Sequence, residues 1–277
     1  MRYKNTVGRA VATVLMLIAG IAFVLPFAWM ISASIKPEID VFKYPIEWLP
    51  KQWMAYDNYR EVWFGEYPFV TYYWNTIKVT VLTTAVSVGV SCMAAYGFSH
   101  VDFAGRNALF VVVLMTFMIP SASILVPQFM IFRWLNLFDT HLGLILLGSF
   151  SALGTFMMRQ FFLGIHKDYL DAGRMDGAGH ARLFVGIAMP LVRPAIATYA
   201  ILRFIWTWND YANPLIFLRS DALSTIQLGI QKFASESGVY YSLIMAGTVS
   251  AILPLIAIFV IGQKQVIEGI SLGGVKG

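Results

Sequence analysis

Between Ala10 and Ile35 the chain reads AVATVLMLIAGIAFVLPFAWMISASI, a run of 26 residues without a charged side chain. An α-helix rises about 1.5 Å per residue, so about 20 residues cross the hydrocarbon core of a bilayer. The run is longer than the apolar region of a signal peptide, and no small-x-small cleavage site follows Ile35. It therefore predicts a transmembrane helix that stays on the mature protein.

Further charge-free runs repeat this pattern along the chain. They cover residues 79–99, 107–132, 142–158 and 237–263, and a sixth apolar run at 191–208 is interrupted by Arg203. Only 13% of the residues are charged and 58% are hydrophobic, whereas a soluble domain carries about 25% charged residues. Backbone polar groups in lipid must be satisfied internally, which favours helices. The fold class is thus predicted to be all-α, a polytopic membrane protein with six transmembrane helices.

The charged residues are distributed unevenly between the segments that join these spans. If both termini lie in the cytoplasm, the cytoplasmic segments hold 11 basic and 5 acidic residues. The external segments then hold 8 basic and 10 acidic residues. An excess of Lys and Arg is typical of cytoplasmic loops. The net charge of +5 therefore indicates membrane topology and not nucleic-acid binding, and both termini are predicted to be cytoplasmic.

Helix-breaking residues and loops suggest how the chain is organised. Pro120 predicts a break near Met118 to Pro120, since a proline inside a helix removes a backbone hydrogen bond. A short amphipathic helix is expected around residues 226–233. The predicted segments are a cytoplasmic tail (1–9), the first transmembrane helix (10–35), an external loop (36–73), a transmembrane core (74–264) that includes a cytoplasmic loop (159–193), and a flexible cytoplasmic tail (265–277).

The loop at 159–193 is the most polar of the cytoplasmic segments. Asp168 is a suitable N-cap for a short helix over 169–175, and Gly177 suits the C′ position that ends it. A second amphipathic helix is expected over 178–187, stopping before Pro190. Two short helices joined at a glycine would form a compact knob, residues 168–190, on which another protein could dock.

The knob resembles the loop of permease subunits of ABC importers. That loop has the form Glu-Ala-Ala, three residues, Gly, nine residues, Ile-x-Leu-Pro; the spacing matches here, with Asp171, Gly173 and Met189 as substitutions. The resemblance implies that this loop couples the permease to an ATPase. The residues that would carry the coupling are Asp171, Ala172, Gly173, Asp176, Gly177, Ala178, Ile187, Met189 and Pro190.

The resemblance to carbohydrate importers extends over nearly the whole chain. Residues 204–210 and 213–215 look like those of carbohydrate-importer permeases, and the ending 273–277 is similar to the small permease subunit of maltose-type importers. The resemblance implies the type I ABC importer permease fold and the import of a sugar, with an oligosaccharide as the favoured class, into a prokaryotic cell. The tail residues Gly273, Gly274, Val275 and Lys276 would contact the ATPase.

The same resemblance implies a set of partners. These are a second permease subunit in a heterodimer, two ATP-binding cassette subunits and an extracytoplasmic sugar-binding protein. The chain has no Gly-x-x-x-x-Gly-Lys-Ser/Thr loop to hold phosphates. We therefore expect no cofactor on this chain and no enzymatic activity of its own, with ATP and Mg²⁺ bound by the partner ATPase.

A few polar and aromatic residues near the fifth span are candidates for the pore or for substrate binding. Arg203 is an intramembrane charge of the kind that tends to face a cavity, although it could also reach toward an interface. Sugars stack on aromatic rings, but an interfacial aromatic belt would explain the same residues. The candidates are Arg203, Trp206, Trp208, Asn209, Asp210 and Asn213.

Other functions fit the sequence less well. An ion-coupled secondary transporter usually has ionisable residues at the membrane midplane, and no Asp or Glu lies within a predicted span. A membrane enzyme or metal site would need clustered ligands, whereas His100, His141, His166 and His180 are scattered and Cys92 reads as a small packing residue. The sequence does not distinguish a sugar permease from an ABC permease for a polyol or glycerol phosphate.

Overall fold

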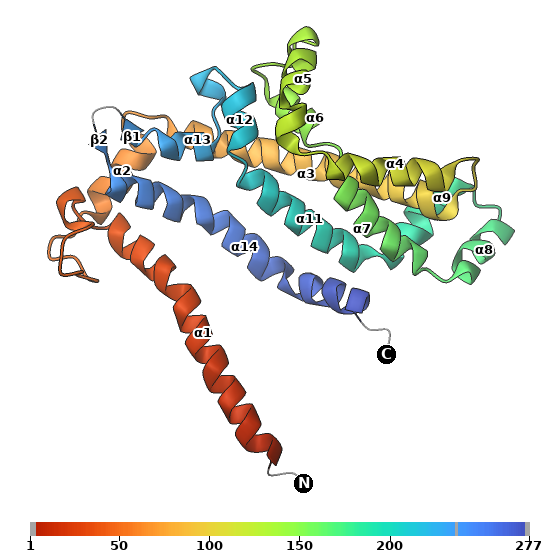
Figure 1. The fold of residues 1–277 in the computed structure, drawn as a ribbon, viewed down its shortest axis with the longest axis horizontal. Helices are drawn as coiled ribbons and strands as arrows, with labels where there is room; N and C mark the ends of the chain where they lie inside the picture. The colour runs from red at the N-terminus through yellow and green to blue at the C-terminus, as the bar shows by residue number, and fades with distance from the viewer. Residues whose placement is uncertain (1–3, 236–237, 275–277) are drawn as a thin grey trace. The chain divides into compact units, whose positions relative to one another are not determined.

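The computed structural model describes residues 4–235 and 238–274, in which helices are the dominant secondary structure (Figure 1). The exception is a short antiparallel ladder between β1 (Ala234–Ser235) and β2 (Gly238–Val239). The predicted all-α fold class is confirmed.

Three helices within the described residues are long and apolar enough to cross a membrane. They are α1 (Lys4–Ser34), α3 (Phe69–His100) and α14 (Tyr241–Gly274). Three further candidates are pairs of helices bent at a break. α4 (Arg106–Met118) and α5 (Ser121–Trp134) meet at 101°, α6 (His141–Leu147) and α7 (Ala152–Leu163) at 50°, and the helical run 180–191 meets α11 (Arg193–Trp208) at 81°. With each pair counted as one span, six spans result, as the sequence predicts.

The breaks have local causes. Ile119 is extended before Pro120, so the predicted break is confirmed. The break at 148–151 follows from capping: the Ser151 hydroxyl accepts from the backbone N–H of Gly154 and starts α7. The third break falls at Val192, and Pro194 occupies the first turn of α11, where its missing N–H costs nothing.

Two predicted boundaries were wrong. α3 begins at Phe69, inside the predicted external loop (36–73), because Phe69 and Tyr72 are buried and the helix is held by packing before its apolar run starts. The predicted external loop also contains η1 (Glu38–Asp40) and α2 (Ala55–Phe64). At the other end α14 continues as a helix to Gly274, where a flexible tail was expected, because the sequence has no proline after Pro254 that would end the helix. Val275 and Lys276 lie outside the described residues.

The chain divides into two compact units, and the first combines the residues up to Val70 with Gly229–Leu253. Within it, the Glu38 carboxylate accepts hydrogen bonds from the backbone N–H groups of Tyr241 and Ser242 and from the Ser242 hydroxyl, at 2.8–2.9 Å. This carboxylate caps the start of α14 and complements the positive end of the helix.

The second unit comprises Thr71–Leu228 together with the residues from Pro254 onward. In this unit α7 packs against α4 and α11 (Figure 1). Its short elements are α8 (Lys167–Met175), α9 (His180–Leu183), η2 (Phe184–Ala188), α10 (Met189–Leu191), α12 (Ala212–Phe217), η3 (Asp221–Leu223) and the start of α13 (Ile226–Gln231). The helix expected over 226–233 is thus present as α13.

Candidate functional sites: an exposed knob and a helix-lined cavity

The knob, residues 168–190, begins with α8 and turns sharply at Gly177. The backbone N–H of Gly177 donates to Arg174 O at 2.9 Å and that of Ala178 to Gly173 O at 3.0 Å, which is the Schellman pattern of hydrogen bonds. Gly177 has φ of +77°, a conformation that costs other L-residues about 1–2 kcal/mol. The predicted C′ position is therefore confirmed.

Two details of the predicted knob were wrong. α8 starts at Lys167, so Asp168 lies inside the first turn and makes no side-chain cap; it contacts His166 instead, at 3.2 Å. The second helix does not stop before Pro190 but runs through it to Leu191, with η2 as a π-helical turn just before the proline. In a regular α-helix the ring of Pro190 would clash with the carbonyl group four positions earlier. The wider π-helical turn relieves this clash, so the helix continues through the proline.

The motif residues separate into an exposed set and a packed set. Exposed on the knob are Asp171, Ala172, Asp176 and Gly177. Gly173 is buried, and Ala178, Ile187, Met189 and Pro190 are half-buried. A Cβ at Gly173 would approach the side chains of Leu183 and Ile187 to 2.6 Å, so glycine at this position lets α8 pack closely against the second helix of the knob.

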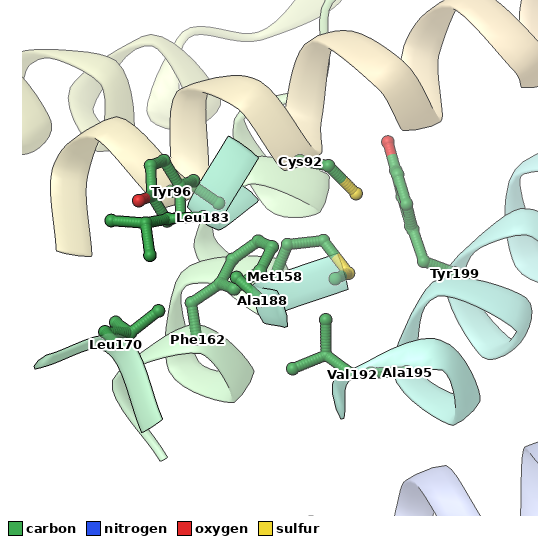
Figure 2. Close-up of a cluster of buried hydrophobic side chains, with 11 residues drawn as sticks. Cys92, Tyr96, Met158, Phe162, Leu170, Leu183, Ala188, Val192, Ala195 and Tyr199 are labelled. Atoms are coloured by element: carbon green, nitrogen blue, oxygen red, sulfur yellow. The ribbon is translucent and has the colours of Figure 1, made fainter. Parts of the chain in front are cut away.

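A cluster of buried side chains joins the knob to the long helices (Figure 2). Leu170 of α8 and Leu183 of α9 pack with Tyr96 of α3 and Phe162 of α7, and the Tyr96 and Phe162 rings meet edge to face at 6.0 Å. Cys92 is fully buried in this cluster, which confirms its predicted packing role. Because interiors packed at crystal-like density resist compression, the knob and helices α3, α7 and α11 should move together.

A cavity of about 340 Å³ lies elsewhere in the same unit, at the lower end of the range for small-molecule sites. Its walls come from α3, α6, α11 and the segment between α11 and α13. The lining residues are Thr76, Val79, Thr80, Thr83, Leu144, Leu147, Gly148, Phe150, Arg203, Trp206, Thr207, Asp210, Asn213, Pro214 and Thr225.

Arg203 enters this cavity from α11 and is fixed by the break between α6 and α7. Its Nη2 donates to the carbonyl of Gly148 at 2.5 Å. A Cβ at Gly148 would lie 2.7 Å from that nitrogen and 2.4 Å from Thr83 Cγ2. The glycine therefore makes room for the guanidinium beside α3.

The other five candidates for the pore fall into two groups. Trp206, Asp210 and Asn213 line the cavity with Arg203, and both carboxylate oxygens of Asp210 accept from Asn213, at 3.1 Å from its backbone nitrogen and 2.7 Å from Nδ2. Trp208 does not reach the cavity: it is buried and stacks on Phe204 with ring centres 5.6 Å apart. Asn209 is exposed and bonds back to Ile205 O.

Sequence reasoning missed the threonines of the cavity. The hydroxyls of Thr80, Thr83, Thr207 and Thr225 are buried and have no hydrogen-bond partner in the part of the chain that the structure describes. Thr76, Thr80 and Thr83 are spaced four and three residues apart along α3, which places them on one helix face. This spacing was the available signal.

Side chains of α3 also bind the segment that follows α12. The Tyr72 hydroxyl lies 2.8 Å from both carboxylate oxygens of Asp221, and Asn75 Nδ2 donates to the carbonyls of Ala222 and Ser224. The Thr76 hydroxyl accepts from the backbone N–H of Ile226 at 2.8 Å. These bonds fix residues 221–226, including the lining residue Thr225, to the start of α3.

Residues 85–269 match the family described as binding-protein-dependent transport system inner membrane components. The chain is 33% identical to the arabinooligosaccharide transport system permease protein AraQ of Bacillus subtilis, over 98% of this chain and 97% of the relative. It is also 33% identical to the trehalose transport system permease protein SugB of Mycobacterium tuberculosis, over 94% and 95%. A chain from the crystal structure of a bacterial ABC transporter involved in the import of the acidic polysaccharide alginate superposes with a TM-score of 0.82 at 25% identity, over 95% of this chain and 97% of that one.

Proposed function

Since this chain belongs to the family of binding-protein-dependent transport system inner membrane components, we propose that it is the permease subunit of an ATP-driven carbohydrate importer. The relatives named for arabinooligosaccharides and trehalose support a sugar as the substrate class, with an oligosaccharide favoured. The observation that carries the proposal is the packing of the knob onto α3 and α11, two helices that also line the cavity.

The knob is the proposed contact with an ATPase subunit. Its outward face carries Asp171 and Arg174, which pair at 2.6 Å, and Met175, which is 89% exposed. An exposed methionine beside a charge pair is suited to a protein interface, since Met adapts to irregular apolar surfaces. Gly273 and Gly274 at the end of α14, with Val275 and Lys276, are proposed as a second contact with the ATPase.

The mechanism follows from rigid coupling. When the ATPase closes on ATP and Mg²⁺, the knob is displaced, and the buried cluster carries this displacement to α3, α7 and α11. α3 and α11 also supply cavity-lining residues, so the cavity would open alternately to the two sides of the membrane. This is a domain rearrangement between two states. Hydrolysis itself belongs to the partner, and the isolated chain is expected to show no ATP turnover.

The proposed assembly has four further subunits. A second, different permease would complete the translocation path, two ATP-binding cassette subunits would supply energy, and an extracytoplasmic binding protein would deliver the sugar. The chain would lie in the cell membrane with both termini in the cytoplasm, as the excess of Lys and Arg in the proposed cytoplasmic loops supports.

A substitution at Gly177 tests the coupling. Valine at φ of +77° should distort the turn, because β-branched residues avoid the left-handed region. In liposomes containing the complete importer and no ion gradient, Gly177→Val should lower ATP-driven sugar uptake at least tenfold while ATP hydrolysis continues.

The matched control is Gly179→Val. Gly179 lies two residues further along, has φ of −72° and has no atom within 4 Å of a Cβ, so uptake should be close to that of the unmodified chain. Normal uptake by Gly177→Val would refute the proposed role of the knob.

A further inference from the structure

Three of the buried hydroxyls that line the cavity belong to almost fully buried threonines. Thr80, Thr83 and Thr225 are each at most 4% exposed, line the cavity and have no hydrogen-bond partner among the described residues. Threonines in helices usually bond back to a carbonyl one turn earlier. Thr198 and Thr248 do so here, at 2.9 and 2.7 Å. The cavity hydroxyls are therefore free to bind something else.

The charges in the cavity cancel. Arg203 and Asp210 both line it, and no ion pair joins them in the described part of the chain. Arg203 is held by Gly148 O and its buried Nε has no partner there, while both oxygens of Asp210 accept from Asn213. A ligand with a negative charge would gain attraction from Arg203 and suffer repulsion from Asp210 in a poorly screened space.

Trp206 adds an aromatic ring to the cavity wall. It lies on the cavity wall and is 44% exposed, so part of its ring is available for contact. Aromatic faces pack well against apolar surfaces, and a sugar ring has an apolar C–H face with hydroxyls around its edge. A ring of this kind would meet the indole with its face and the threonine hydroxyls with its edge.

We infer that this cavity is a binding subsite for an uncharged sugar unit, held by the hydroxyls of Thr80, Thr83 and Thr225 and by the face of Trp206. The inference rests on the proposed function and adds that this subunit contacts the substrate itself and prefers neutral over acidic sugars. The volume of about 340 Å³ suits one small ligand and not a long chain.

A protection assay tests the subsite without the ATPase, so its failure is distinct from a failure of coupling. The full chain carrying Leu147→Cys, at a half-buried lining position that is not among the proposed binding residues, is placed in lipid nanodiscs and treated with a charged thiosulfonate reagent. Trehalose, the neutral probe, should slow the modification at least threefold, and glucuronate at the same concentration should not. The unmodified chain, whose Cys92 is buried, is the blank, and Ala212→Cys, at an exposed position outside the lining, should show no protection.

Each other outcome of this assay overturns the inference. Equal or stronger protection by glucuronate would make Arg203 an anion site. Modification that neither probe slows would indicate a water-filled passage. Failure of the reagent to reach Leu147→Cys, both in the chain alone and in the ATP-bound importer, would show that the cavity does not admit solutes.

Two further variants sharpen the result. Asp210→Asn leaves the charge of Arg203 uncompensated, so glucuronate should then protect Leu147→Cys at least as well as trehalose does. In the complete importer, Thr80→Val with Thr83→Val should raise the KM for trehalose uptake about tenfold without changing the ATP hydrolysed per sugar at saturation. Thr248→Val, which removes a back-bonded hydroxyl outside the cavity, is the control. An unchanged KM in the double variant would contradict the inference.

Discussion

The buried cluster behind the knob and the helix-lined cavity share α3 and α11 but use these helices in opposite ways. The cluster is apolar and close-packed, and its Tyr199 hydroxyl lies 3.0 and 3.2 Å from the hydroxyls of Ser87 and Ser91. The cavity is lined by threonine hydroxyls, by Arg203 and by Asp210. The difference shows that α3 and α11 combine a stiff half, suited to carrying force, with a half that leaves its polar groups available.

The comparison predicts the largest loss of stability for a large side chain of the cluster. Phe162 is fully buried and its ring contacts Tyr96, His100 and Phe184. Phe162→Ala should lower the free energy of unfolding by about 3–5 kcal/mol, the usual cost of such a cavity. The neighbouring Leu163 is exposed, so Leu163→Ala should cost far less. Thermal unfolding in detergent measures both, and similar losses would show that the cluster is not a stiff core.

The second-largest predicted loss of stability comes from adding a methyl group at Gly154. A Cβ at Gly154 would lie 2.0 Å from the Tyr199 hydroxyl oxygen, whereas nothing lies within 4 Å of a Cβ at Gly89. Gly154→Ala should therefore destabilise by about 1–3 kcal/mol through overpacking. Gly89→Ala, also within a long helix, should be neutral or slightly stabilising. Equal unfolding temperatures for the two variants would contradict the close packing at Tyr199.

Removing a hydroxyl group should change stability differently in the cluster and in the cavity. Tyr199→Phe takes a partner from Ser87 and Ser91 and should cost about 1–2 kcal/mol of unfolding free energy. Thr83→Val removes a hydroxyl that has no partner among the described residues, so stability should stay the same or rise. Differential scanning fluorimetry of the purified variants would show the contrast, and a larger loss for Thr83→Val would reverse it.

The smallest predicted change in stability concerns Asp139, in the unit that contains the cavity, and it depends on pH. Hydrogen bonds from the side chain and backbone of Ser220 and from the backbone of Arg219 hold the pKa of Asp139 below its usual range. These bonds stabilise the folded state above the ordinary carboxyl pKa of about 4, and their contribution is lost as the pH falls through the lowered value. Because the carboxylate lies near the surface and is only partly buried, the effect should be small.

Hydrogen exchange at the amides of Arg219 and Ser220 would measure this loss. After correction for intrinsic rates, their protection should fall at low pH in the unmodified chain and be weak at every pH in Asp139→Asn. A pH-dependent loss that persists in Asp139→Asn would assign it to another group.

Much of the fold could be predicted because it depends on local chemistry. Charge-free runs mark the spans, Pro120 breaks the third span, and Gly177 ends α8 at the predicted position. The break at 148–151 was missed, since Gly148 and Ser151 permit a bend without requiring one. Pro190 was read as a stop because a sequence does not reveal that a π-helical turn will precede it.

The candidate sites were predicted less evenly. The exposed half of the knob follows from spacing, whereas the cavity depends on contacts between residues far apart in the chain. Arg203 was identified as a charge within a span, but its partner Gly148 lies 55 residues earlier. Trp208 and Asn209 were chosen beside Trp206, yet a helix places neighbouring residues on different faces, and only Trp206 of the three lines the cavity.

The absence of a side chain at Gly148 has an evolutionary consequence. Because a single added carbon would collide with both Thr83 and Arg203, the three positions should not vary independently among homologous sequences. A lineage that acquires alanine or serine at position 148 should also carry a shorter residue at 203 or at 83.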